Sequence, residues 1–277
     1  MISIIIPAHN EASVIARCLS NLYEGIAAQS VQVIVACNGC SDNTASIARS
    51  VAGVEVLEIS KPSKVNALNE ADRHASYFPR VYLDADLMVS GADIIKLASS
   101  FQSDDSLMVV SPSMSLNDSC SGYLVRSFNK VWTSMPHYDR RVGGLFVLSE
   151  KARNSFIEFP DVIADDAFVK HTFSEQDILH RKDVSFECIS PVGIWDLIKI
   201  KSRSRYGNKQ LLRKFPMLRK VSNNGISDLF DFLKKNPFDL ISIIIYVSVQ
   251  CFTILRARYY YSESKNTIWE RDESSRT

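Results

Sequence analysis

The sequence predicts an α/β fold, a mainly parallel mixed sheet flanked by helices, and three observations support this prediction. Short runs of β-branched apolar residues, typical of buried strands, alternate with helical patterns through the first hundred residues. Polar clusters follow three of these runs, as at the carboxyl ends of parallel strands. Apolar residues make up 46% of the chain and charged residues 23%, which fits a folded core.

The expected elements follow one another in a regular order. The expected strands are 2–6, 31–36, 54–59 and 81–83, and the expected helices are 12–23, 44–51 and 63–74. The first helix has apolar residues at helical spacing, and Asn10 is its expected N-cap. Strands that alternate with helices need right-handed crossovers, so we expect a Rossmann-like sheet with both faces covered.

The second half of the chain predicts a change of organisation. Gly143 and Gly144 open an apolar run, and after residue 103 helical and strand patterns mix. From Leu197 to Ser227 there is no acidic residue, and 240–255 is almost continuously apolar. We therefore expect a catalytic domain over 1–200 and a basic and apolar helical extension over 201–277.

Composition excludes some classes of function. The net charge is +1, so no overall charge indicates a nucleic-acid partner. Six cysteines are scattered through a chain too long for a disulfide scaffold, and the N-terminus has no basic, apolar and small-residue series typical of a signal peptide. These features favour a cytoplasmic protein.

One pair of these cysteines, Cys37 and Cys40, forms a Cys-x-x-Cys motif after the second strand. A redox motif of this kind opens a helix, but here Gly39 lies between the cysteines and the next helix is expected only near Asn43. A zinc site needs two further ligands, and no second Cys-x-x-Cys or His pair supplies them. A loop in which the thiols have no chemical role is the favoured interpretation.

Two carboxylates, Asp84 and Asp86, follow the fourth strand with Ala85 between them. On an extended chain their side chains point the same way, so a cation is needed to offset their repulsion. Oxygen ligands suit Mg²⁺ or Mn²⁺, which commonly bind through one or two carboxylates and substrate phosphates. The alternative is a pair of solvated residues at a strand end.

The ordered motifs together resemble the family-2 inverting glycosyltransferases, which have the GT-A fold. The motifs are IIIPAHNEA, VIVACNGCSDNTA, KVNALN and YLDADL, within residues 2–86. The resemblance implies a nucleoside-diphosphate sugar as donor, with a UDP-sugar favoured, and Mg²⁺ or Mn²⁺ as cofactor. Cys37 stands where the family commonly has Asp, which leaves the base open.

The resemblance also implies which residues serve the donor. The nucleotide-sugar-binding set is Pro7, Ala8, His9, Asn10, Glu11, Asn38, Asp42, Lys64, Asp84, Ala85 and Asp86, with Asp84 and Asp86 as metal ligands. Lys64 is expected to face the diphosphate or ribose, unless it is an exposed lysine in a first helical turn. Asn69 is expected to be a local structural residue.

An inverting transfer needs a carboxylate that accepts the proton of the attacking hydroxyl. By resemblance to the family's acidic pair, Asp166 is the expected base, with Asp165 as a supporting or alternative residue, although an acidic start of a helix has the same pattern. Gly143 and Gly144 are expected beside the acceptor. Arg203 and Arg205 are candidates to stabilise the leaving diphosphate, or belong to a solvated basic face.

The C-terminal apolar segment 240–255 has 16 residues, fewer than the ~20 that span a bilayer core. Basic residues flank it, which favours a helix that lies in an anionic leaflet, with a buried core helix as the alternative. We expect a cytoplasmic protein associated with the inner face of the cytoplasmic membrane.

The sequence therefore predicts a glycosyltransferase that acts on a saccharide or lipid-linked acceptor in the assembly of cell-surface polysaccharide. Two alternatives stay open at this stage. A sugar-nucleotide pyrophosphorylase needs a Gly-rich basic loop after the first strand, which Pro7–Glu11 does not offer. A catalytically silent, membrane-associated nucleotide-sugar-binding protein is disfavoured by the complete set of acids.

Overall fold

The computed structural model describes residues 1–218 and 225–263, which divide into two compact units. Unit 1 comprises 1–115, 142–161 and 165–188, and unit 2 comprises 116–141, 162–164 and 189–277. Both units therefore contain segments from distant parts of the sequence. The division into a catalytic domain over 1–200 and an extension over 201–277 stays a prediction.

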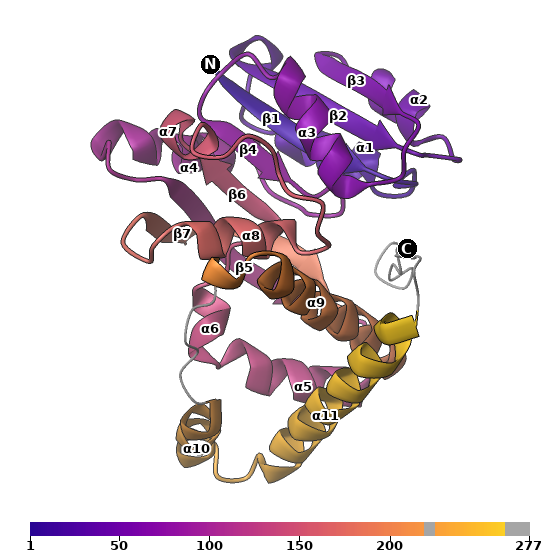
Figure 1. Ribbon diagram of the computed structural model, residues 1–277, viewed down its shortest axis with the longest axis vertical. Helices are drawn as coiled ribbons and strands as arrows, with labels where there is room; N and C mark the ends of the chain where they lie inside the picture. The colour runs from indigo at the N-terminus through magenta and orange to yellow at the C-terminus, as the bar shows by residue number, and fades with distance from the viewer. Residues whose placement is uncertain (219–224, 264–277) are drawn as a thin grey trace. The chain divides into compact units, whose positions relative to one another are not determined.

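The elements follow one another in the order labelled in Figure 1. The strands are β1 Ile2–Ala8, β2 Val31–Asn38, β3 Val54–Ile59, β4 Arg80–Leu83, β5 Val109–Asn117, β6 Leu145–Leu148 and β7 Ile178–Ile189. The helices of unit 1 are α1 Ile15–Leu22, α2 Thr44–Arg49, α3 Lys64–His74, α4 Gly91–Ser103, α7 Glu150–Arg153 and α8 Asp165–Thr172, with the 3₁₀ turn η1 Ala28–Ser30. The helices of unit 2 are α5 Tyr123–Thr133, α6 Pro136–Asp139, α9 Ile194–Lys214, α10 Gly225–Lys235 and α11 Leu240–Glu263, with η2 Pro216–Leu218.

The strands form one seven-stranded mixed sheet with the order β3-β2-β1-β4-β6-β5-β7. Strands β3, β2, β1 and β4 are parallel, while β6 is antiparallel to both β4 and β5. The predicted mainly parallel mixed sheet flanked by helices is confirmed. The reversal at β6 brings Gly143 and Gly144 to the edge where β4 ends.

Alternation along the strands separates two packing faces. Ile4 and Ile6 of β1 belong to a core cluster with residues of α1, α2 and α4, whereas the intervening Ile5 is absent from that cluster. Helix α3 packs on β1 and β2 and crosses in front of them in Figure 1. This period of two is the one expected of a strand buried on both faces.

Some predicted boundaries differ from the structure. Strand β1 continues through Pro7 to Ala8, because Pro7 pairs with Ala36 in the parallel ladder. Helix α1 begins at Ile15, and its N-cap residue is Val14, so the prediction of Asn10 as N-cap is wrong. Asn10 instead has φ 52°, and its side chain accepts a hydrogen bond from the Ser41 amide (2.7 Å). A turn after β1 replaces the first helical residues expected from the pattern.

Candidate active site

Lys64 connects two acidic segments in unit 1. Its Nζ lies 2.8 Å from Asp84 Oδ1 and 3.1 Å from Asp165 Oδ2. Lys64 is the first residue of α3, Asp84 follows β4, and Asp165 begins α8. The fold thus joins the expected metal site, the expected diphosphate lysine and the expected base segment, which are far apart in the sequence. The interpretation of Lys64 as an exposed lysine is wrong, because its side chain is 18% exposed.

Burial governs the electrostatics of this cluster. Burial by itself lowers the pKa of Lys64, but the carboxylates of Asp165 and Asp84 outweigh it and raise that pKa above its usual value. Burial raises the pKa of Asp165 to about 6, against the opposing effect of Lys64. Asp165 and Lys64 thus form a buried ion pair, in which each charge offsets part of the cost of burying the other.

Asp166 differs from its neighbour in position. It is half-buried, whereas Asp165 is buried. A Cβ atom built on Gly143 would lie 2.6 Å from Asp166 Oδ2, so only glycine leaves room for this carboxylate. The next residue, Gly144, has φ +74° and accepts a hydrogen bond at its carbonyl from the Asp84 amide (2.8 Å). The two glycines therefore lie between the two acidic segments.

The segment that carries Asp84 and Asp86 is a turn and not an extended chain. Strand β4 ends at Leu83, and the Leu87 amide donates to the Asp84 carbonyl (3.3 Å). The two side chains are therefore not aligned by an extended chain, and that prediction is wrong. Both carboxylates are nevertheless half-buried, and Ala85 between them is buried.

Two oxygen-donor side chains beside a buried lysine fit a hard divalent cation that takes its remaining ligands from a diphosphate and water. Within the described part of the chain, no group of three or more His, Cys, Asp or Glu side chains could hold a metal ion by itself. Asp84 and Asp86 are the residues that would hold Mg²⁺ or Mn²⁺ here.

The loops after β1 and β2 are joined by hydrogen bonds. His9 Nδ1–H donates to the Asn38 carbonyl (2.5 Å), and Asn38 Nδ2 donates to the Ala8 carbonyl (2.8 Å). Asp42 accepts from the amides of Ala12 (3.1 Å) and Thr44 (3.0 Å). Two of the residues predicted to bind nucleotide, Asn38 and Asp42, thus have side chains that support the loops.

The remaining predicted donor residues lie in the same region. Pro7 and Ala8 are buried in β1, and Glu11 is buried after it, with its amide donating to Thr44 Oγ1 (2.7 Å). These positions follow directly from the parallel pairing of β1 with β2. The roles of these residues in nucleotide binding stay predictions.

The Cys-x-x-Cys lies in this loop pair. Cys37 is buried at the end of β2, and burial raises the pKa of its thiol to about 12. Cys40 Sγ accepts from the Asn10 amide (3.4 Å) and donates to the Ala8 carbonyl (3.5 Å). A thiol with such a high pKa is a poor nucleophile, so Cys37 has no evident reactive character. The interpretation that the two thiols have no chemical role stays a prediction.

Arg203 and Arg205 lie on α9 in unit 2. Arg205 donates to Gln250 Oε1 of α11 (2.7 Å), an interaction between helices that the sequence did not indicate. A role of either residue at a diphosphate stays a prediction.

Asn69, expected to be a local structural residue, instead makes a long-range contact. Its Oδ1 accepts from the Phe159 amide (2.9 Å), and its Nδ2 donates to the Phe159 carbonyl (3.0 Å). The side chain therefore pairs with the backbone of the segment that leads to Asp165, as a neighbouring strand would. No pattern in either segment alone reveals this contact.

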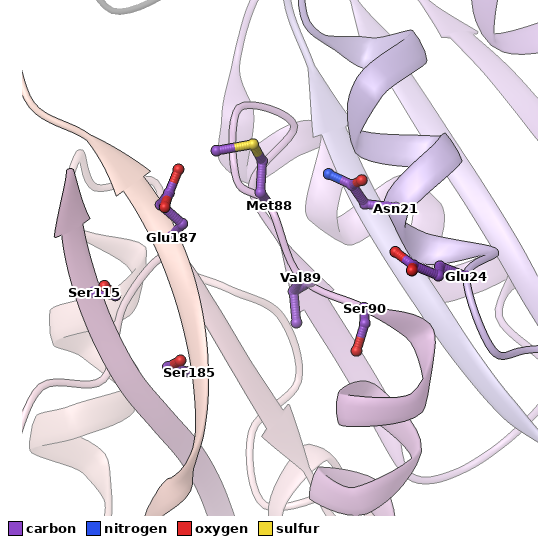
Figure 2. A pocket seen from close by; sticks show the side chains of 8 residues that line it. All are labelled: Asn21, Glu24, Met88, Val89, Ser90, Ser115, Ser185 and Glu187. Atoms are coloured by element: carbon purple, nitrogen blue, oxygen red, sulfur yellow. The ribbon is translucent and has the colours of Figure 1, made fainter. Parts of the chain in front are cut away.

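An open pocket of about 280 Å³ lies in unit 1 beside Met88–Ser90, the residues that follow the Asp84–Leu87 turn (Figure 2). Its lining is Asn21, Glu24, Met88, Val89, Ser90, Ser115, Ser185 and Glu187, which includes none of the predicted site residues. The side chains drawn in Figure 2 form no tight constellation, so this pocket gives no reason to move the candidate site.

Comparison with protein families now adds to this geometry. The family model of glycosyl transferase family 2 matches residues 3–149, more than half of the chain. The chain belongs to glycosyl transferase family 2. The matched range includes Lys64, the Asp84–Asp86 turn and the two glycines, and the predicted family resemblance is confirmed. A comparison with curated proteins found no match.

Solved structures share the fold of this family-2 chain at low sequence identity. One is the mannosyltransferase PcManGT from Pyrobaculum calidifontis in complex with GDP-Man and Mn²⁺, which matches this chain with a TM-score of 0.60 at 20% sequence identity. The match covers 93% of this chain and 75% of the mannosyltransferase chain. Glucosyl-3-phosphoglycerate synthase from Mycobacterium tuberculosis, in complex with Mn²⁺, UDP and phosphoglyceric acid, has a TM-score of 0.57 at 16% identity, covering 80% of each chain. These similarities support the GT-A fold assignment.

Proposed function

We propose that this family-2 protein is an inverting glycosyltransferase that moves a sugar from a nucleoside-diphosphate sugar to a hydroxyl of a saccharide or lipid-linked acceptor. One observation carries the proposal: Lys64 bridges Asp84 and Asp165, 2.8 and 3.1 Å away, in a family-2 fold. This bridge brings the residues suited to a metal and diphosphate beside a second carboxylate pair, as a transfer between two substrates requires.

The donor side consists of oxygen ligands and one cation. Asp84 and Asp86 would hold Mg²⁺ or Mn²⁺, which neutralises charge on the departing diphosphate. Lys64 adds a fixed positive charge within 2.8 Å of Asp84. Solved structures with this fold include complexes with Mn²⁺ and GDP-Man or UDP, which supports this choice of ligand.

Asp166 is the proposed base. Asp165 is buried and paired with Lys64, whereas Asp166 is half-buried and has a glycine opposite its carboxylate. The acceptor oxygen bonds to the anomeric carbon as its proton passes to the Asp166 carboxylate. The bond from the anomeric carbon to the diphosphate oxygen breaks on the opposite side, which inverts the configuration and releases the nucleoside diphosphate.

The proposed setting is the assembly of cell-surface polysaccharide on the inner face of the cytoplasmic membrane, with a UDP-sugar as the favoured donor. One span in the described part of the chain, Leu240–Tyr259, is long and apolar enough to cross a membrane, and 22% of it is buried.

Membership of family 2 disfavours the alternative of a sugar-nucleotide pyrophosphorylase.

A panel of nucleotides tests the proposal. Thermal unfolding and donor hydrolysis are measured with UDP-, GDP- and other nucleotide sugars, each with Mg²⁺, Mn²⁺ or a chelator. We expect one nucleoside diphosphate to raise the Tm and its sugar derivative to be hydrolysed, in both cases only with a divalent ion. The proposal is wrong if no nucleotide sugar raises the Tm or is turned over under any of these conditions.

A further inference from the structure

Helix α11 of unit 2 exposes most of its large apolar side chains, unlike a helix on the surface of a water-soluble protein. Its buried side chains are Ser242, Tyr246, Val249 and Thr253, which recur every three or four residues and form one stripe. Its large apolar side chains are exposed instead, among them Leu240, Ile241, Ile244, Val247, Phe252 and Leu255. A helix in water buries its apolar stripe and exposes its polar one, so this outward face suits an apolar surrounding.

The buried stripe is occupied by protein. Helix α11 packs on α5 and α9, as Figure 1 shows, and Tyr246 stacks on Phe128 with ring centroids 5.1 Å apart. The hydroxyl side chains of Ser242 and Thr253 are therefore buried on the side of α11 that packs on protein. The prediction of a buried core helix does not describe α11, because only one stripe is covered.

Exposed apolar side chains are concentrated in unit 2. Among the described residues, 14 of the 18 large hydrophobic residues that are exposed belong to this unit. Four of them, Tyr123, Leu124, Val192 and Trp195, lie where α5 and α9 begin, and the Gly122 amide donates to the Val192 carbonyl (2.9 Å), which joins the two helix starts. Tyrosine and tryptophan are the side chains that favour the boundary between lipid and water.

Charge is divided between the units in the same way. The sequence of unit 2 has 20 Lys and Arg against 10 Asp and Glu, whereas that of unit 1 has 12 against 21. The near-neutral chain therefore contains a strongly basic half. Lys234 and Lys235 precede α11, and Arg256 and Arg258 follow its apolar part.

We infer that unit 2 docks on an anionic lipid bilayer through the outward face of α11. A basic unit repels a second copy of itself but is attracted to anionic lipids, and the exposed apolar side chains then enter the boundary between headgroups and acyl chains. Because the opposite stripe of α11 is packed on α5 and α9, the helix lies along the surface instead of crossing it. The inference deepens the proposed function, on which it rests for its purpose, by placing the enzyme where a lipid-linked acceptor resides.

Vesicle flotation of the purified full-length protein tests this inference without donor or turnover, so its outcome is separate from that of the nucleotide panel. We expect the protein to float with phosphatidylcholine vesicles that contain phosphatidylglycerol, and to bind pure phosphatidylcholine more weakly. The double variant Ile244→Gln, Leu255→Gln should reduce binding at least about tenfold, because both side chains are 56% or more exposed and face outward. Lys234→Gln with Lys235→Gln should weaken binding on the order of tenfold, and only for anionic vesicles.

The matched control is Ile95→Gln with Ile157→Gln, which removes two exposed isoleucines from unit 1. This control should bind vesicles like the wild type, and both apolar double variants should keep the wild-type circular dichroism spectrum. The inference is overturned if the wild type stays in solution with anionic vesicles at low salt, or if the α11 variant floats like the wild type. It is equally overturned if the wild type does not bind lipid and instead forms a dimer that the α11 substitutions dissociate.

Discussion

At the scale of single residues, the two neighbouring acids at the start of α8 have different environments. Asp165 is buried against Lys64, and Asp166 is half-buried against Gly143. Two adjacent carboxylates in a sequence look equivalent, yet it is Asp165 that forms the ion pair with Lys64. This difference is the basis on which we propose charge balance for Asp165 and proton transfer for Asp166.

Asp166→Asn keeps the shape of the side chain but removes its capacity to accept the acceptor's proton. We expect kcat to fall by roughly 10²–10⁴-fold with little change in donor affinity. Asp165→Asn should reduce kcat less but lower the urea midpoint of unfolding, because the buried Lys64 then has a single acidic partner. Steady-state kinetics and urea titration of both variants measure these effects. A larger kcat loss at 165 would move the base by one position.

Gly143→Ala tests the room that Asp166 needs. The added Cβ would lie 2.6 Å from Asp166 Oδ2, the free end of a side chain, so the carboxylate should rotate away while the fold persists. We expect the transfer rate to fall by at least about tenfold with an unchanged Tm and unchanged binding of the metal–nucleotide complex. Wild-type transfer by Gly143→Ala would show that the position of this carboxylate is not important for the reaction.

At the scale of elements, α3 holds the base segment in place. Asn69 pairs with both backbone groups of Phe159, and Asp72 of the same helix binds Arg153 Nε (2.5 Å). Arg153 in turn donates to the carbonyl of Phe156 (2.9 Å). The same helix begins with Lys64, so one element positions both sides of the proposed site.

Asn69→Ala should remove both hydrogen bonds and leave two backbone groups of Phe159 without partners. We expect a loss of about 2 kcal/mol in the free energy of unfolding, measured with urea, and a lower transfer rate per folded molecule. The control is Glu158→Gln, which removes an exposed ion pair with Arg73 between the same helix and segment and should leave both quantities unchanged. If Asn69→Ala and Glu158→Gln had the same transfer rate per folded molecule, a positioning role for Asn69 would be contradicted.

Local patterns were sufficient to predict the strands and helices of the first half of unit 1. The runs at 2–6, 31–36 and 54–59 are short, apolar and separated by helical patterns, so each strand is indicated by its own residues. Polar residues at the ends of parallel strands must meet, which is why Asn38 and the loop after β1 were placed together correctly. The turn at Asp84–Leu87 was missed because polar and apolar residues alternate along it, as they do along a strand.

The contacts that complete the site could not be predicted in the same way. Lys64 meets Asp165 and Asn69 meets Phe159 across about a hundred residues, and neither pair has a local signature. The length of α11 was also underestimated, because the apolar run 240–255 ends at Arg256 while the helix continues to Glu263. Only its packing on α5 and α9 reveals which face is outward.

At the scale of the whole molecule, the two units differ in charge and in exposed apolar surface, so we assign them different tasks. Unit 1 contains the acidic cluster with its lysine, and unit 2 contains the exposed apolar side chains of α11 and most of the Lys and Arg of the chain. Catalysis and membrane docking can therefore be tested separately. The central claim concerns unit 1: that Asp84 and Asp86 bind the metal–nucleotide complex.

The most direct test is calorimetric titration of Asp86→Ala with the nucleoside diphosphate that stabilises the wild type, in the presence of Mn²⁺. We expect the wild type to bind only with the divalent ion and the variant to lose this binding with its circular dichroism spectrum unchanged, because a half-buried turn residue contributes little to the core. Asp105→Ala, which removes an exposed acid of unit 1, should bind like the wild type. Wild-type affinity and metal dependence in Asp86→Ala would contradict the assignment of this site.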